Sequence, residues 1–126
     1  IALFTDTDLQ KRARKIARVG GVKNFTDEQL QYFMQNLPAE FARYDAQQTS
    51  DYLALNAGLV AMNLVLALTD QGIGTNIILG FDKSKINEVL DIEERFRPEV
   101  LITVGYAAEK VEPSYRLPVD EIIDKR

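Results

Sequence analysis

One stretch of this chain, residues 52–68, carries no charged side chain in seventeen positions. Its only strongly polar side chains are those of Asn56 and Asn63. A helix that is apolar all round is buried on every side or lies in a membrane. Seventeen residues are at the lower limit for a membrane span, and two asparagines and a glycine make a poor one. We therefore expect a central core helix, packed in part across a dimer interface, and no membrane partner.

Composition narrows the chemistry that such a chain can perform. The 126 residues, of net charge -4, have the length of a single domain. The chain has no cysteine, which excludes a disulfide framework, thiol catalysis and a zinc finger. It has no histidine, which excludes a Ser-His-Asp triad and a histidine-ligated metal. Any chemistry must come from carboxylates, Arg or Lys, Tyr, backbone amides or a bound cofactor.

The order of apolar and turn residues predicts one α+β domain over residues 1–126. A short strand is expected at residues 1–5, where the chain starts without Met inside an apolar run. This start suggests that residue 1 lies within a longer polypeptide. Residues 99–106 form the best strand, apolar enough to be central. Helices are expected at about residues 8–19, ended by Gly20-Gly21, after the Thr26–Gln29 capping box, at residues 52–68, and at about residues 83–90 with Asp82 as N-cap.

Five of the 15 basic residues lie close together on the first predicted helix: Lys11, Arg12, Arg14, Lys15 and Arg18. A basic helix can follow the phosphates of a nucleic acid. However, no aromatic side chain is interleaved for base stacking, and the remainder of the chain is acidic. We interpret the run as a solvated helix face and expect no nucleic-acid partner.

Two glycine positions and one arginine are weak indications of a ligand site. The run GIGTN, which begins at Gly72, has the wrong spacing for a dinucleotide fingerprint and follows a helix, so by itself it indicates a helix C-cap. Gly80 is a second position where a backbone can approach a ligand closely, because no Cβ intervenes. Arg116 has the planar group that clamps a phosphate, although composition alone favours a surface ion pair.

The order of these features along the chain is more specific than any one of them. The ordered set is the long apolar helix, DQGIGTN from residue 70, LGFD from residue 79, a strand ending in GY at residues 105–106, and SYRLP from residue 114. The set resembles the C-terminal part of the flavin-dependent nitroreductase family, and it is most similar to the short bacterial NAD(P)H nitroreductases. The resemblance covers nearly the whole chain and is most specific over residues 51–126.

The resemblance implies a nitroreductase-like fold, with an antiparallel-rich central sheet, surrounding helices, and the N-terminal part missing. The Arg-rich stretch by which the family grips the flavin phosphate and ribityl chain has no counterpart in this sequence. The loop with which the family lines the flavin is also absent from it. We therefore expect that these 126 residues alone neither hold FMN nor are active.

The resemblance assigns six residues to flavin binding: Asn76, Ile77, Leu79, Gly80, Ser114 and Arg116. The backbone N–H of Gly80 would face the flavin N5, with Leu79 just before it. Arg116 matches the basic residue that contacts the FMN phosphate, and Ser114 stands where some relatives carry Lys. The first two residues of the set would lie near the ring. No catalytic side chain and no metal ligand is assigned, because the flavin performs the redox step.

In this interpretation the protein is a cytoplasmic homodimer, with each flavin at the subunit interface and residues 52–68 at the core of that interface. It would take hydride from NADH or NADPH (NAD or NADP as the oxidised form) and pass electrons to a nitroaromatic, quinone or other small electron-poor acceptor by a ping-pong mechanism. The alternative is a non-catalytic α+β interaction or structural domain without flavin, in which the glycines are only caps. A yellow chromophore in the full-length protein would separate the two.

Overall fold

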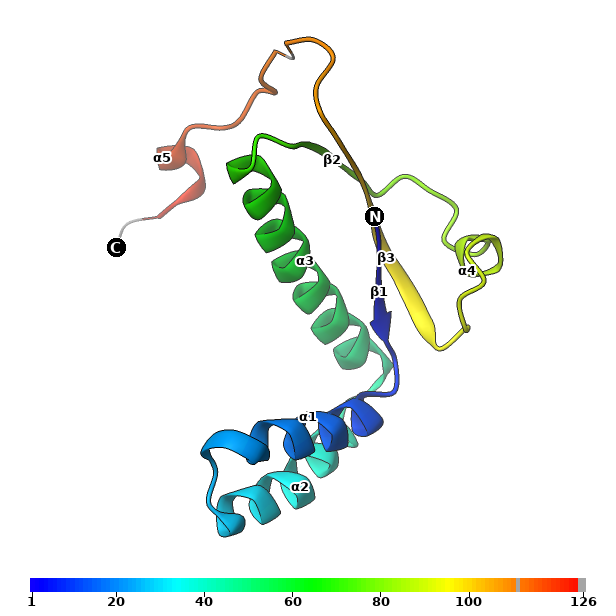
Figure 1. Cartoon of the computed structure of the whole chain (residues 1–126), viewed down its shortest axis with the longest axis vertical. Coiled ribbons are helices and arrows are strands. Elements are labelled where there is room, and N and C mark those ends of the chain that lie inside the picture. The colour runs from blue at the N-terminus through cyan, green and yellow to red at the C-terminus, as the bar shows by residue number, and fades with distance from the viewer. Residues whose placement is uncertain (111, 125–126) are drawn as a thin grey trace.

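The computed structural model of the protein describes residues 1–110 and 112–124, without the side chains of residues 17 and 20–24. Its elements are β1 (Ala2–Asp6), α1 (Leu9–Asn24), α2 (Asp27–Phe41), α3 (Ala46–Asp70), β2 (Gly74–Ile78), α4 (Ile86–Val89), β3 (Phe96–Gly105) and α5 (Val119–Ile122). Figure 1 shows the strands and the long helix α3 together, with the α1–α2 hairpin beyond one end of the sheet. The predicted α+β class is confirmed.

The three strands form one antiparallel sheet in the order β1-β3-β2, so the strand predicted to be central is central. The register between β1 and β3 shifts between Leu3 and Phe4, which lie opposite Val100 and Pro98. Glu99 is thus the extra residue of a β-bulge. A bulge is where a strand tolerates proline, because proline lacks the N–H that a regular ladder requires.

Helix α3 lies along the sheet and contacts all three strands (Figure 1). It begins with a capping box, in which the Gln48 N–H donates to Asp45 Oδ1 over 2.7 Å and the Asp45 N–H donates to Gln48 Oε1 over 3.0 Å. It ends at Asp70, and Gly72, two residues further on, has a left-handed φ of 74°, with the Ile73 N–H donating to the Leu68 carbonyl over 2.9 Å. The helix is 25 residues long, because its polar first turns precede the uncharged stretch.

Only one face of α3 is buried in the chain. Leu53, Ala57 and Ala61 are at most 7% exposed. Four apolar side chains elsewhere on the helix are 49–64% exposed: Leu55, Leu59, Met62 and Leu66. The single chain thus buries only one face of the helix, because a three-stranded sheet covers only one face, and burial of the remainder at a dimer interface stays a prediction. By length and composition α3 is also the one helix of the described residues that could cross a membrane, a test that core helices of soluble proteins also pass.

A polar network fixes the N-terminal turns of α3 to the sheet. Arg97 Nη1 donates to Ser50 Oγ over 2.8 Å, and Nη2 donates to the Ser50 carbonyl over 3.1 Å. The same guanidinium donates from Nε to Glu99 Oε1 over 2.7 Å, and Thr5 Oγ1 donates to that oxygen over 2.5 Å. Glu99 is only 8% exposed, and its burial is tolerated because the carboxylate is paired and hydrogen-bonded.

The α1–α2 hairpin confirms one helix boundary and corrects another. The predicted capping box is present, with the Gln29 N–H donating to Thr26 Oγ1 and the Thr26 N–H donating to Gln29 Oε1. Gly20 and Gly21 do not end α1, which runs on to Asn24. A glycine inside a helix costs only about 1 kcal/mol, and the packing of α1 along α2 offsets that cost.

Candidate functional site

Four of the six residues assigned to flavin binding lie at the free edge of the sheet. Asn76 and Ile77 are on β2, which is an edge strand, and Leu79 and Gly80 follow it directly. All four residues are exposed. The segment therefore offers backbone groups and apolar side chains to a ligand without first having to unpack.

Ile77 and Leu79 contribute to a groove of about 340 Å³ beside α3. Ala54 and Gly58 of α3, one helical turn apart, leave room for the groove because their side chains are small. The sequence analysis missed these two, although small residues four positions apart were the available signal. Since side chains alternate along a strand, Asn76 lies on the opposite face from Ile77. The groove therefore unites two of the predicted residues and leaves Asn76 outside.

Gly80 presents a backbone donor to an open surface. Within the part of the chain that the structure describes, its N–H donates to no backbone or side-chain acceptor. Its φ is not in the left-handed region, and an ideal Cβ added there meets no atom within 4 Å. Neither the backbone conformation nor the packing of this chain requires glycine at position 80. The close approach of a ligand to the backbone would require it. These features fit a group that receives a hydrogen bond from the Gly80 N–H.

The loop after Gly80 is braced by an acidic side chain. The Ser84 hydroxyl and N–H both donate to Asp82 Oδ1, over 2.6 and 3.0 Å. These hydrogen bonds hold the pKa of the exposed Asp82 carboxyl below its ordinary value. The helix predicted for residues 83–90 is reduced to the single turn α4, and its N-cap is Lys85, not Asp82. The prediction was wrong because the Asp82 carboxylate satisfies the N–H of Ser84 inside a turn before the helix begins.

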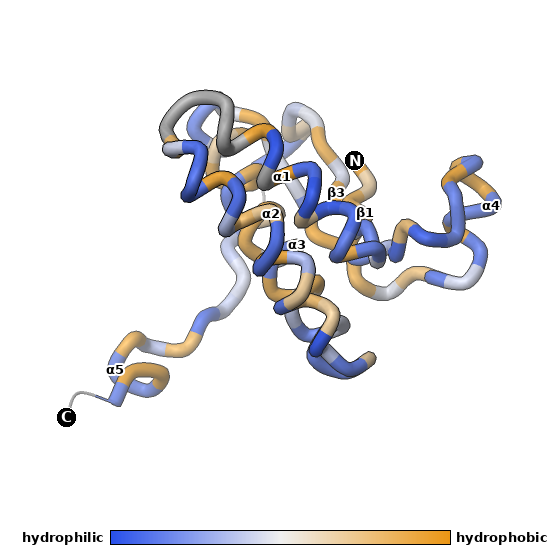
Figure 2. The backbone as a smooth tube through the Cα atoms, turned by 90° about the horizontal axis from the view of Figure 1, so that it is seen from below, coloured by the Kyte–Doolittle hydropathy of each residue, from blue (hydrophilic) through white to orange (hydrophobic). Residues whose placement is uncertain are grey.

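Ser114 and Arg116 lie on the segment between β3 and α5, which runs apart from the sheet in both views (Figures 1 and 2). Arg116 Nη1 donates to the neighbouring Tyr115 carbonyl over 2.9 Å. Within residues 1–110 and 112–124, its guanidinium forms no ion pair, so the expected surface pair is not found there. The segment that carries Arg116 thus runs apart from the sheet in the single chain, and most of the Arg116 donors remain available for a phosphate.

The described residues include no cluster of carboxylates that could hold a metal ion. The arrangement consists instead of a free backbone donor, an apolar groove and a detached arginine. Residues 3–106 match the model of the Nitroreductase family. The chain belongs to the nitroreductase family. The resemblance predicted from the ordered motifs is thus confirmed. The family consists of oxidoreductases.

Relatives of this chain carry the name NAD(P)H nitroreductase. The chain is 64% identical over 126 residues to Spy0809 of Streptococcus pyogenes, a match that covers 100% of this chain and 62% of that protein. It is 38% identical over 89 residues to YdgI of Bacillus subtilis, covering 70% of this chain and 43% of that protein. The chain thus spans less than two thirds of the length of these relatives.

Solved structures share the fold. A nitroreductase family protein from Streptococcus pneumoniae TIGR4 superimposes with a TM-score of 0.91 at 86% identity, over 99% of this chain and 62% of that one. A nitroreductase from Exiguobacterium sibiricum 255-15, solved in complex with FMN, gives a TM-score of 0.88 at 27% identity, over 99% of this chain and 60% of that one. The predicted nitroreductase-like fold is confirmed.

Proposed function

We propose that the full-length protein is an FMN-dependent oxidoreductase. It takes hydride from NADH or NADPH and passes electrons to a small electron-poor acceptor, such as a nitroaromatic or a quinone, in a ping-pong cycle. The observation that carries the proposal is Gly80, whose N–H has no partner among the described residues and which lies, without a side chain, at the open edge of a nitroreductase-family sheet. The FMN complex of the Exiguobacterium relative supports the choice of cofactor.

The residues of this chain would hold and orient the flavin, which supplies the redox chemistry when it is bound. The Gly80 N–H would donate to the ring N5, where a fixed donor stabilises developing charge. Ile77 and Leu79 would offer apolar contact beside it. Arg116, with Ser114 two residues before it, would bind the phosphate through charge-assisted hydrogen bonds.

We place each flavin at the interface of a cytoplasmic homodimer. In the single chain the segment between β3 and α5, which carries Arg116, runs apart from the sheet, and one apolar face of α3 is uncovered. A second subunit on that face would cover it and would bring further groups to the open groove. The acceptor and the choice between NADH and NADPH are set by groups around this interface.

Substitution of Gly80 tests the proposed donor. Gly80→Val should fold, because a Cβ meets no atom within 4 Å, yet the side chain should crowd the bound ring. We expect flavin binding within a few-fold of the parent and reduction by NADPH about 10²-fold slower, the effect of one misplaced preorganised donor. Stopped-flow reduction with flavin occupancy measured on the same sample gives both values.

The matched control is Gly105→Val at the end of β3, where an added Cβ also meets open space. This variant should keep the parental reduction rate. A folded, flavin-loaded Gly80→Val protein with the parental rate would overturn the N5 assignment. A full-length protein that retains no flavin would instead support the non-catalytic alternative.

Arg116 provides an independent test of cofactor binding. Arg116→Ala removes one charge-assisted contact of roughly 1.5–3 kcal/mol, so FMN should bind about 10–100-fold more weakly. Arg43→Ala removes the same charge from an exposed arginine that pairs with Glu40 on α2 and should leave FMN binding unchanged. Equal flavin retention in the two variants after dialysis would contradict the phosphate role.

A further inference from the structure

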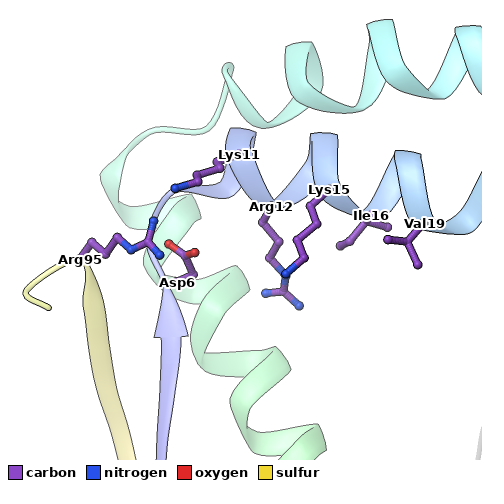
Figure 3. A pocket seen from close by; sticks show the side chains of 7 residues that line it. All are labelled: Asp6, Lys11, Arg12, Lys15, Ile16, Val19 and Arg95. Carbon is purple, nitrogen blue, oxygen red and sulfur yellow. The ribbon is translucent and has the colours of Figure 1, made fainter. Parts of the chain in front are cut away.

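A basic pocket lies where α1 meets the ends of β1 and β3 (Figure 3). Its volume is about 650 Å³, within the range typical of small-molecule sites. Lys11, Arg12 and Lys15 line it from α1, and Arg95 lines it from the turn before β3. Among the described residues that line it, Asp6 supplies the one carboxylate. None of the six residues assigned to the flavin lines this pocket.

The three cationic groups that α1 contributes have no counter-ion among the described residues. Among the residues that the structure describes, no carboxylate lies within 4.0 Å of the charged groups of Lys11, Arg12 or Lys15. Like charges one helical turn apart, such as Lys11 and Lys15, destabilise a helix. In a chain of net charge -4, this local excess of positive charge attracts anions to the space between the side chains.

Arg95 is held in place before any ligand arrives. Its guanidinium stacks over the Phe96 ring, 4.5 Å from the ring centroid, and Nε lies 3.0 Å from Glu93 Oε2. Nε is removed from solvent, and its N–H is not directed at that oxygen well enough for a hydrogen bond. Thr7 ties the segment to the end of β1 by donating its N–H and hydroxyl to the Arg95 carbonyl. A guanidinium fixed in this way loses little entropy on binding an anion.

The pocket also has an apolar wall. Ile16 and Val19 follow Arg12 at four and seven positions on α1, so the three share one face of the helix (Figure 3). Ile16 is 49% exposed and Val19 is 66% exposed. The pocket is thus charged at one end and apolar at the other.

We propose that this pocket binds a nucleoside diphosphate group, with the pyrophosphate among Lys11, Arg12, Lys15 and Arg95 and the base against the Ile16–Val19 wall. Lysine and arginine are the residues that bind phosphate groups, and an aliphatic wall suits a planar base. The group is either a free nucleotide or part of a pyridine dinucleotide, two sources with the same chemistry. The site does not depend on the proposed flavin site.

The first test is calorimetric titration of ADP and of inorganic pyrophosphate into the full-length, flavin-loaded protein at an ionic strength of about 0.15 M, where charges outside the pocket are largely screened. Lys15→Glu should weaken the binding of both by at least about 10-fold, since it replaces an attractive charge with a repulsive one. Arg14→Glu is the matched control, because Arg14 neighbours Lys15 on α1 and is exposed but does not line the pocket. It should change binding by less than about two-fold.

A second variant separates the two ends of the pocket. Ile16→Ser should weaken ADP several-fold and leave pyrophosphate binding unchanged, because only the base contacts that wall. The absence of saturable binding of either probe to the parent protein would overturn the proposal. Equal losses in Lys15→Glu and Arg14→Glu would also overturn it, since they would indicate a diffuse basic helix of the kind that follows duplex DNA.

The KM for NADPH distinguishes the two sources of the group. A higher KM in Lys15→Glu, together with the loss of ADP binding, would support a site for the dinucleotide reductant. An unchanged KM together with the loss of ADP binding would support a separate nucleotide site. Flavin content is measured on every sample. Lack of flavin in a parent protein that binds ADP would count against the proposed oxidoreductase and would leave the pocket supported.

Discussion

The two faces of α3 are built from the same kind of side chain and meet different surroundings. Leu53 and Ala57, on the inner face, are at most 7% exposed. Leu59 and Leu66 are 58% and 57% exposed. The apolar side chains of α3 are thus removed from water on one side of the helix only. An uncharged helix therefore specifies how much surface must be covered, but it does not specify which part of the molecule covers it.

The outer face is a surface that water does not favour. We use this name for the side of α3 that carries Leu55, Leu59, Met62 and Leu66. Contiguous exposed apolar patches mark interaction sites. The proposed second subunit is the partner that fits this surface, because a self-complementary apolar helix face suits a two-fold interface. Three substitutions test whether the two faces differ in this way.

The inner face should show the largest effect on stability. Leu53→Ala removes a side chain that is 0% exposed and leaves a cavity between α3 and its neighbours, at a cost of about 2–5 kcal/mol in the free energy of unfolding. Leu55→Ala is the matched control, because the same change at a 64% exposed position creates no cavity within the subunit. Urea unfolding of both full-length variants gives the comparison. Equal losses would show that the outer face is buried as fully as the inner face in the full-length protein.

Local features of the sequence were the predictable ones. The Thr26 capping box is encoded within four residues, and the long apolar run of β3 identified the central strand. The end of α1 was not predictable from Gly20-Gly21, because packing against α2 overrides a weak local preference.

Long-range features of the candidate site were less accessible. Arg95 is distant from Lys15 in sequence, and only the pairing of β1 with β3 brings the two to one pocket. The basic run was therefore interpreted as a solvated face. Gly80 and Arg116 were found through their family positions, and the structure adds the free N–H of Gly80, which no sequence pattern reveals. Their roles at the flavin remain predictions.

The polar network of Glu99 and Arg97, which holds α3 to the sheet, should contribute less to the free energy of unfolding than Leu53 does. Glu99→Gln keeps the shape of the side chain but removes the charge that faces Arg97, at a cost of about 1–2 kcal/mol. The loss stays moderate because the Arg97 side chain is 29% exposed and can reach water. Glu93→Gln, the control, breaks an exposed pair with Arg95 and should cost less than about 0.5 kcal/mol. An equal cost in denaturant unfolding would contradict the anchoring role of Glu99.

The outer face should show the smallest effect on the subunit itself and a large one on assembly. Leu59→Lys places an ammonium where the single chain leaves 58% of the side chain in water, so the free energy of unfolding of a separated subunit should change by about 0.5 kcal/mol or less. In a dimer built on this face the charge would be buried without a partner, so the subunits should separate. Light scattering after gel filtration gives the mass of the Leu59→Lys protein, and flavin content is measured on the same sample.

Leu64→Lys is the contrasting variant on the same helix, because Leu64 packs against the buried cluster of Ala61, Val100 and Ile102. It should unfold the subunit, whereas Leu59→Lys should give a folded monomer that has lost flavin. A Leu59→Lys protein that remains dimeric would show that the outer face is not the interface. Flotation of the parent with anionic vesicles, lost in Leu59→Lys, would then identify a membrane as the surface that covers it. If Leu59→Lys remains dimeric and the parent does not float with vesicles, neither a second subunit nor a membrane covers the outer face. The two faces of α3 would then differ in burial but not in function.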